Sequence, residues 1–156
     1  MKTFCRSAAS LLIGILLISL ASADEKSPGS QSGAEALRTV EKSGDLGKAG
    51  QILGMVGFFG EPEPVQWLVL TDQEKKPGAL IELVVRDGEI LAKRKVKRDA
   101  SRDMPSIPFA SGQIRINSGE ASRTAGDLAR DKGISFSTMH FQLRCRDQGN
   151  EPVWTI

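Results

Sequence analysis

The stretch ALIELVVRDGEILAKRKVKR, residues 79–98, decides the fold of this chain. Its apolar residues on both sides of Asp87-Gly88 have the spacing of strands. Asp-Gly is the typical pair of a two-residue type I′ turn, whose positive φ angles match the twist of a β-hairpin. We therefore predict antiparallel strands over residues 79–86 and 89–98, joined by this turn.

A third strand is expected just before this hairpin, over VQWLVLT at residues 65–71, with the polar turn DQEKKPG at residues 72–78 between them. Together the three strands predict an antiparallel meander. The last strand ends in KRKVKR at residues 93–98. Lysines in such a segment are typical of an edge strand protected from pairing with other chains, and the alternative is a basic stripe for an acidic ligand.

The C-terminal third predicts one helix and a second hairpin. Asn117 and Glu120 have the spacing of a capping box, and Gly133 is well placed to end the following helix in the left-handed conformation. Residues 134–146 then predict a long strand, and residues 152–156 begin a return strand after a Gly-Asn turn.

The N-terminal region predicts two helices. Ser32 and Glu35 form a capping box for a short helix that ends near Ser43-Gly44. A second helix is expected over residues 45–56, although glycines recur along it and each interior glycine costs up to about 1 kcal/mol. We interpret them as close packing of a helix on a sheet. The fold class is therefore α+β, an antiparallel sheet (a three-stranded meander plus a C-terminal hairpin) with helices packed on one face.

Residues 1–23 have the pattern of a cleaved secretory signal. A basic head is followed by an apolar run and by Ala21-Ser22-Ala23, a small-x-small cleavage site. The run is shorter than the roughly 20 residues of a spanning helix, so no transmembrane anchor is expected after cleavage. We expect a disordered linker over residues 24–33 and a single α+β domain over residues 34–156, in a secreted or periplasmic protein.

Cleavage would also remove the apparent basic character. The chain has 21 Lys+Arg and 19 Asp+Glu, and Lys2 and Arg6 lie in the signal, which leaves 21 − 2 = 19 basic against 19 acidic residues. A neutral chain has no bulk electrostatic attraction to nucleic acid or to an anionic membrane. We expect no nucleic-acid partner.

The residue types of catalysis do not come together in this sequence. His140 and Cys145 lie five positions apart on one predicted strand, so their side chains are expected on opposite faces and too far apart for a nucleophile–base pair. No spacing of a metal or cofactor site is present. We predict a protein that is not an enzyme, with no catalytic residue, no metal and no cofactor.

Six residues are candidates for contact with a partner. His140, Gln142, Arg144 and Arg146 alternate onto the polar face of the predicted strand 134–146, and Cys145 shares the apolar face. Ile107 and Phe109 lie in the long connection of residues 99–112. They are either an exposed apolar clip for a partner or anchors that fold back onto the core, and we favour the anchors.

The segment from Asn117 to Ile156 resembles the PepSY-like modules of uncharacterised secreted bacterial proteins. In those, a phrase such as F-x-L-R precedes P-V-W, as Phe141–Arg144 and Pro152–Trp154 do here, and Pro64–Leu70 resembles the region before their first hairpin. The resemblance implies a binding or inhibitory module without chemistry, and it carries over no functional residue. Similar chains continue after P-V-W-T with another strand, so either this product is truncated, or its edge is completed by another copy or by a bound peptide.

These expectations lead to a functional hypothesis. The chain is an exported, non-catalytic module that recognises a polypeptide or peptidase of the cell envelope by strand pairing at the open edge beside residues 134–146. The alternative is a self-associating structural protein, in which a second copy closes the same edge as a homo-oligomer.

Overall fold

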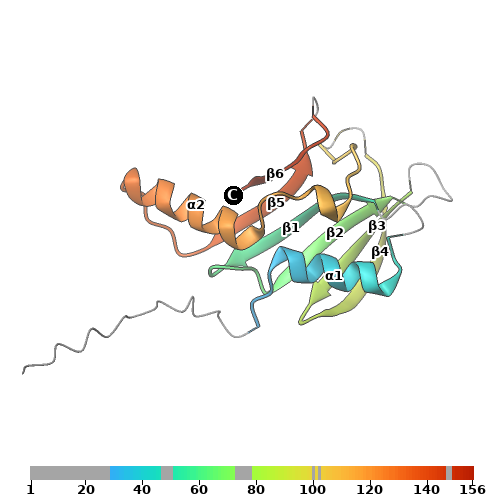
Figure 1. The fold of residues 1–156 in the computed structure, drawn as a ribbon. Helices are drawn as coiled ribbons and strands as arrows, with labels where there is room; N and C mark the ends of the chain where they lie inside the picture. The colour runs from blue at the N-terminus through green and yellow to red at the C-terminus, as the bar shows by residue number, and fades with distance from the viewer. Residues whose placement is uncertain (1–28, 47–50, 73–78, 100, 102, 147–148) are drawn as a thin grey trace, which may run out of the picture.

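The computed structural model describes residues 29–46, 51–72, 79–99, 101, 103–146 and 149–156. This part of the chain forms two α-helices and a six-stranded antiparallel sheet, so the α+β class is confirmed. The strands lie in the order β4-β3-β2-β1-β5-β6 (Figure 1). The elements are α1 (Gly33–Ser43), β1 (Ile52–Gly60), β2 (Gln66–Asp72), β3 (Ala79–Arg86), β4 (Glu89–Lys97), a 3₁₀ helix η1 (Ser111–Gln113), α2 (Ser118–Asp131), β5 (Met139–Cys145) and β6 (Pro152–Thr155).

The turn predicted between β3 and β4 is confirmed. Asp87 and Gly88 have φ angles of 51° and 76°, as a type I′ turn requires, and β3 pairs with β4 from Arg86 opposite Glu89 onward. β4 is an edge strand of the sheet, as its lysines suggest. The predicted polar turn after β2 lies almost entirely outside the described residues.

The prediction of a second helix over residues 45–56 is wrong, because β1 begins at Ile52 and pairs with both β2 and β5. Its glycines lie where neighbouring side chains approach the strand closely. A Cβ at Gly57 would lie 2.5 Å from Pro64 Cγ, and one at Gly60 would lie 2.6 Å from Phe141 Cε2. The glycines therefore serve close packing as expected, but within a strand, where glycine marks a close approach of neighbouring groups.

The core lies between α1 and one face of the sheet. α1 buries Ala36, Leu37 and Val40, and it packs across β2, β3 and β4. Its capping box is confirmed, since Ser32 Oγ accepts from the Glu35 amide and the Glu35 carboxylate accepts from the Ser32 amide. Beside α1, the fully buried Trp67 contacts Phe141 and Trp154 edge-on, with ring centroids 5.6 and 5.9 Å away.

Buried hydrogen bonds fix the start of α1 against the sheet. The Gly33 amide donates to Ser118 Oγ at 2.9 Å, and this hydroxyl donates to Glu63 Oε1 at 2.9 Å. The Gln31 carbonyl accepts from Trp67 Nε1 at 2.6 Å, and the Gln31 amide donates to the Pro64 carbonyl. The disordered linker expected over residues 24–33 therefore does not extend through residues 30–33, which are packed. The predicted signal, residues 1–23, lies outside the described residues.

α2 is much less buried than α1. Asn117 Oδ1 caps it by accepting from the Glu120 amide, and Gly133 ends it with a φ of 66°. Ser118 and Ser122 are its buried residues, whereas Leu128 is 54% exposed. Figure 1 shows α2 beside the β5–β6 end of the sheet, whereas α1 lies across β2–β4.

Candidate functional site

Four of the predicted partner-binding residues lie on or just after β5, and those within the strand point away from the core. Gln142 pairs with Val56 of β1, which pairs with Leu68 of β2, so these three side chains share the face opposite α1. His140 lies exposed on the same face, and Arg146 is exposed after the strand. The alternation predicted for β5 therefore holds.

The surroundings of these four side chains differ. His140 contacts the exposed rings of Phe58 and Phe59 edge-on, with centroids 5.6 and 4.9 Å away. Arg144 Nη2 lies 2.7 Å from Asp103 Oδ2, and this hydrogen bond and the positive charge of Arg144 lower the pKa of Asp103 below 3.8. They are thus separate contacts along the strand and form no common cluster.

Ile107 and Phe109 lie away from this surface. Phe109 is 1% exposed and exchanges two backbone hydrogen bonds of 2.8 Å with Ile52. Ile107 is half-buried and packs against the core. Both residues thus lie against the core, as the anchor interpretation expects, and the buried Phe109 side chain is not accessible to a partner in this structure.

The strand predicted over residues 134–146 is shorter than expected, because β5 begins at Met139. Met139 is opposite Gly60, the last residue of β1, so the residues before it have no neighbouring strand there to pair with. β5 also lies between β1 and β6 and is not the outermost strand. β6 pairs with residues 142–145, so Met139, His140 and Phe141 extend beyond it on that side.

An apolar groove follows this end of the sheet, between α2 and β6. Its first part has a volume of about 520 Å³. Its second part, of about 360 Å³, lies between α2 and the segment that leads into β5. The two parts share Ala125, Leu128 and Ile156. We call them together the α2–β6 groove; its further apolar lining includes Ile116, Val153, Ile134 and Phe136.

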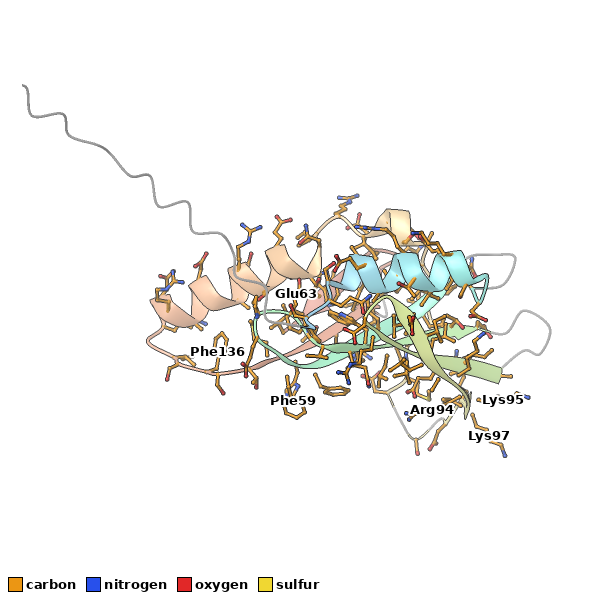
Figure 2. The ribbon with its side chains drawn as sticks, turned by 90° about the horizontal axis from the view of Figure 1, so that it is seen from below. Phe59, Glu63, Arg94, Lys95, Lys97 and Phe136 are labelled. Atoms are coloured by element: carbon orange, nitrogen blue, oxygen red, sulfur yellow. The ribbon has the colours of Figure 1, made fainter. Side chains whose placement is uncertain are left out.

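Large apolar side chains are unusually exposed along the α2–β6 groove. Ile134 is 58% exposed, Leu128 54% and Phe136 46%, and Figure 2 shows Phe136 projecting from the end of the molecule on the same side as Phe59. Contiguous exposed apolar residues mark interaction surfaces more often than scattered ones. The sequence analysis placed Ile134 and Phe136 in a strand. A sign that they lie in a connection was their position in the segment that follows Gly133, where serines occupy positions 135 and 137.

The rim of the α2–β6 groove is polar and carries more positive than negative charge. Arg115 pairs with Glu151 at 2.7 Å between Nη2 and Oε1, whereas Arg146 and Lys132 make no ion pair within the described part of the chain. His140 lines the second part. Such a rim around an apolar floor resembles the composition of polypeptide-binding surfaces.

Cys145 is buried on the opposite face from His140, so the two do not form a nucleophile–base pair. Burial raises the pKa of the Cys145 thiol above 9.0, which lowers its reactivity. No group of three or more His, Cys, Asp or Glu residues that could hold a metal ion occurs among the described residues.

Comparison with protein-family models, with curated proteins and with solved structures finds no match for this chain. Neither helix described here has the length and apolar character needed to cross a membrane.

Proposed function

We propose that this chain is an exported, non-catalytic binding module that recognises an extended polypeptide of the cell envelope in the α2–β6 groove. The bound segment pairs with the part of β5 that extends beyond β6, residues 139–141, and its alternate side chains enter the groove. As part of this proposal, the chain is a member of the PepSY-like family. Its sheet is then a three-stranded meander plus a C-terminal hairpin, with both helices packed on one face.

The observation that carries this proposal is the incomplete cover of β5. Its residues 139–141 extend beyond β6, and the adjacent groove is lined by apolar side chains that are about half exposed. An unpaired strand edge provides backbone donors and acceptors, and the apolar floor provides the affinity that backbone hydrogen bonds lack. An extended polypeptide is the ligand that uses both features.

The test is a hydrogen-exchange experiment with a peptide selected from an array of random synthetic peptides of about eight residues, a common strand length. We expect the peptide to protect the backbone amides of Met139–Phe141. Leu128→Ser should weaken binding at least about tenfold, because it removes a large apolar contact of the bound chain. Leu91→Ser is the matched control, since Leu91 is 56% exposed on β4 at the other edge.

Three results would contradict this function. These are equal binding by the Leu128 and Leu91 variants, protection confined to other strands, and the failure of every peptide in the array to bind. The alternative partner at the same edge is a second copy of this chain. Sedimentation at several concentrations distinguishes it, because self-association raises the mass with concentration and Leu128→Ser should then return the chain to a monomer.

A further inference from the structure

A dense group of cations lies on β4, at the edge of the sheet opposite β6. Residues 92–98 contain five Lys or Arg residues and no Asp or Glu. Figure 2 shows Arg94, Lys95 and Lys97 projecting from the molecule at the end of this strand. We call residues 92–98 the basic edge; the polypeptide groove beside α2 makes no use of it.

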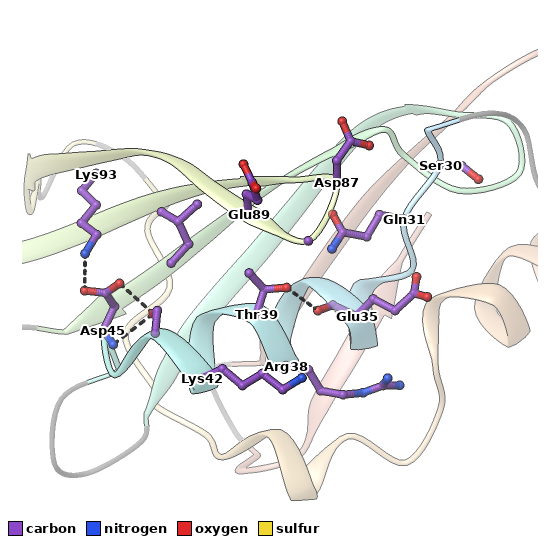
Figure 3. Close-up of a pocket in the computed structure, with 13 residues that line it drawn as sticks. Ser30, Gln31, Glu35, Arg38, Thr39, Lys42, Asp45, Asp87, Glu89 and Lys93 are labelled. Carbon is purple, nitrogen blue, oxygen red and sulfur yellow. Dashed lines mark hydrogen bonds and ion pairs between the residues drawn. The ribbon is translucent and has the colours of Figure 1, made fainter.

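Acidic partners neutralise part of the charge of the basic edge. Lys93 Nζ lies 2.6 Å from Asp45 Oδ1, and a dashed line marks this ion pair in Figure 3. Arg94 Nη1 lies 3.4 Å from Glu82 Oε1 on the neighbouring strand β3. Each of these two cations is therefore offset by one carboxylate, although water and salt screen such partly exposed pairs.

The other three cations of the basic edge have no acidic partner within the described part of the chain. Lys95 and Lys97 are exposed, and their ammonium groups make no ion pair there. Arg98 Nη1 donates to the neutral carbonyl of Pro105 at 3.2 Å. Like charges that lie close together repel one another, so a ligand with carboxylates would relieve this repulsion as well as attract the cations.

The backbone of β4 is also available for pairing on its outer side. β4 pairs with β3 without interruption over residues 92–97, and a register shift leaves Leu91 as an extra residue nearer the turn. No backbone hydrogen bond joins residues 92–97 to an element other than β3 among the residues described. Unpaired donors and acceptors along an edge strand are a template for a further strand.

The alternation of side chains along β4 sets the pattern that a further strand would need. Lys93, Lys95 and Lys97 belong to one face of the sheet, and Arg94 and Val96 belong to the other. Residues directly opposite in neighbouring strands have Cβ atoms about 5 Å apart. Carboxylates at every second position of an added strand would therefore reach the lysine ammonium groups.

A second copy of this chain does not meet this requirement at β4. Two β4 strands paired edge to edge would bring the cations of one copy beside the cations of the other, which destabilises the pairing. A lipid or a polysaccharide can supply anionic groups, but it lacks the regular donors and acceptors of an extended backbone. The ligand that uses both the charges and the open backbone is an acidic polypeptide.

We propose that the basic edge binds an acidic polypeptide segment, which adds to the sheet as a strand beside residues 92–97 and carries Asp or Glu at alternate positions. The lysines thus have two effects, because they exclude strands of like charge and select an acidic one. This site lies at the opposite edge of the sheet from the α2–β6 groove and is independent of it.

The test uses an acetylated and amidated peptide of about eight residues, a common strand length, in which glutamate alternates with threonine. Hydrogen exchange should show protection of the amides within residues 92–97 that are not bonded to β3. A peptide with glutamine in place of glutamate should bind about tenfold more weakly, and one with lysine should not bind. Added salt should weaken the binding of the glutamate peptide more than that of the glutamine peptide.

A charge reversal assigns the site. The double variant Lys95→Glu and Lys97→Glu should lose the glutamate peptide and bind the lysine peptide instead, because the repulsion and attraction exchange places. Both side chains are exposed, so the fold should be unchanged. The matched control is Arg123→Glu with Lys132→Glu on α2, which makes the same change in net charge and should leave the preference for glutamate intact.

Methylation of the peptide backbone tests the strand pairing separately from the charges. In an extended peptide the glutamate amides point to one edge and the threonine amides to the other. One peptide is therefore methylated on the glutamate amides and a second on the threonine amides. The peptide whose methyl groups face β4 should bind at least about tenfold more weakly than the other, because it loses its hydrogen bonds to the strand.

Three results would overturn the inference. These are equal binding of the glutamate and glutamine peptides, equal binding of the two methylated peptides, and equal effects of the charge reversals on β4 and on α2. Protection of Met139–Phe141 instead of β4 would also overturn it, because the peptide would then occupy the α2–β6 groove. None of these outcomes contradicts the polypeptide proposal for that groove, whose test follows different amides.

Discussion

At Gly57 a single hydrogen atom sets how closely β1 can approach its neighbours. A Cβ there would lie 2.5 Å from Pro64 Cγ and 2.8 Å from two atoms of the Trp67 ring. Trp67 is fully buried and its indole is hydrogen-bonded to Gln31, so the ring cannot move aside. We therefore expect Gly57→Ala to lower the free energy of unfolding by about 1–3 kcal/mol, the usual cost of overpacking, as measured by urea denaturation.

Gly126 provides the matched control for Gly57→Ala. It lies in α2, and a Cβ added there would meet no heavy atom within 4 Å. Gly126→Ala should therefore raise the free energy of unfolding by up to about 1 kcal/mol, since alanine favours the helix. If the two variants are equally stable, the close approach at Gly57 does not limit the packing of the sheet.

A second prediction at the scale of single residues concerns the reactivity of the Cys145 thiol. Cys5, in the predicted signal, is replaced by serine so that Cys145 is the one thiol measured. We then expect the native thiol to react with a disulfide reagent at least about tenfold more slowly than that of the urea-unfolded chain, because burial removes access and raises its pKa. The raised pKa also means that the unfolded chain loses the thiol proton first, so stability falls as pH rises above 9.0. Equal rates in the two states would show an accessible thiol.

At the scale of the elements, the ion pair of Asp45 and Lys93 links the end of α1 to β4. Burial raises the pKa of Asp45, but hydrogen bonds from Lys93 and Ser43 and the charge of Lys93 outweigh it and hold the pKa below 3.8. The folded state thus binds fewer protons than the unfolded state. The contribution of the ionised Asp45 carboxylate to stability is therefore present above about pH 4, and it is lost as pH falls through the pKa of Asp45 in the folded state.

Asp45→Asn should therefore cost up to about 1 kcal/mol at pH 7, the range of partly exposed ion pairs. The difference from the original chain should disappear as pH falls below 3.8. Thermal unfolding at a series of pH values measures both. Asp127→Asn is the control, because its pair with Arg130 lies on the surface within one helix; equal losses in the two variants would argue against a specific role of the α1–β4 link.

The elements differ in how well local sequence predicts them. The hairpin turn and the caps at Ser32 and Gly133 depend on residues close in sequence, and they are found as predicted. β1 was predicted as a helix because its decisive contacts, at Gly57 and Gly60, involve Pro64, Trp67 and Phe141. The length of β5 likewise depends on where β1 ends. The packing around these glycines and the pairing that limits β5 both depend on residues distant in sequence, so neither can be recognised from the local sequence.

For the whole molecule, the same distinction applies to the candidate sites. His140, Gln142, Arg144 and Arg146 were identified from alternation alone, which fixes the face of a strand but not its neighbours. The α2–β6 groove joins residues of α2 with the chain around β5 and β6. This groove is a product of the assembled fold and could not be predicted from spacing.

The uneven burial of the two helices predicts an uneven distribution of stability across the molecule. α1 buries three apolar side chains against the sheet, Ala36, Leu37 and Val40, whereas the buried residues of α2 are Ser118 and Ser122. Elements with little buried apolar area open at a lower free energy than the core. In native-state hydrogen exchange, the amides of α2 beyond Ser122 should exchange faster than those of α1, and the amides of β1 should be the slowest.

Truncating one leucine on each helix tests the same difference between α1 and α2. Leu37→Ala should cost about 2–5 kcal/mol of unfolding free energy, as core leucines do, and Leu128→Ala less than about 1 kcal/mol because this side chain is already half exposed. If α2 instead exchanges only with global unfolding, its apolar face is stabilised without any ligand. α2 would then be fully stable in the absence of a ligand, and a peptide bound in the α2–β6 groove could not act by stabilising this helix.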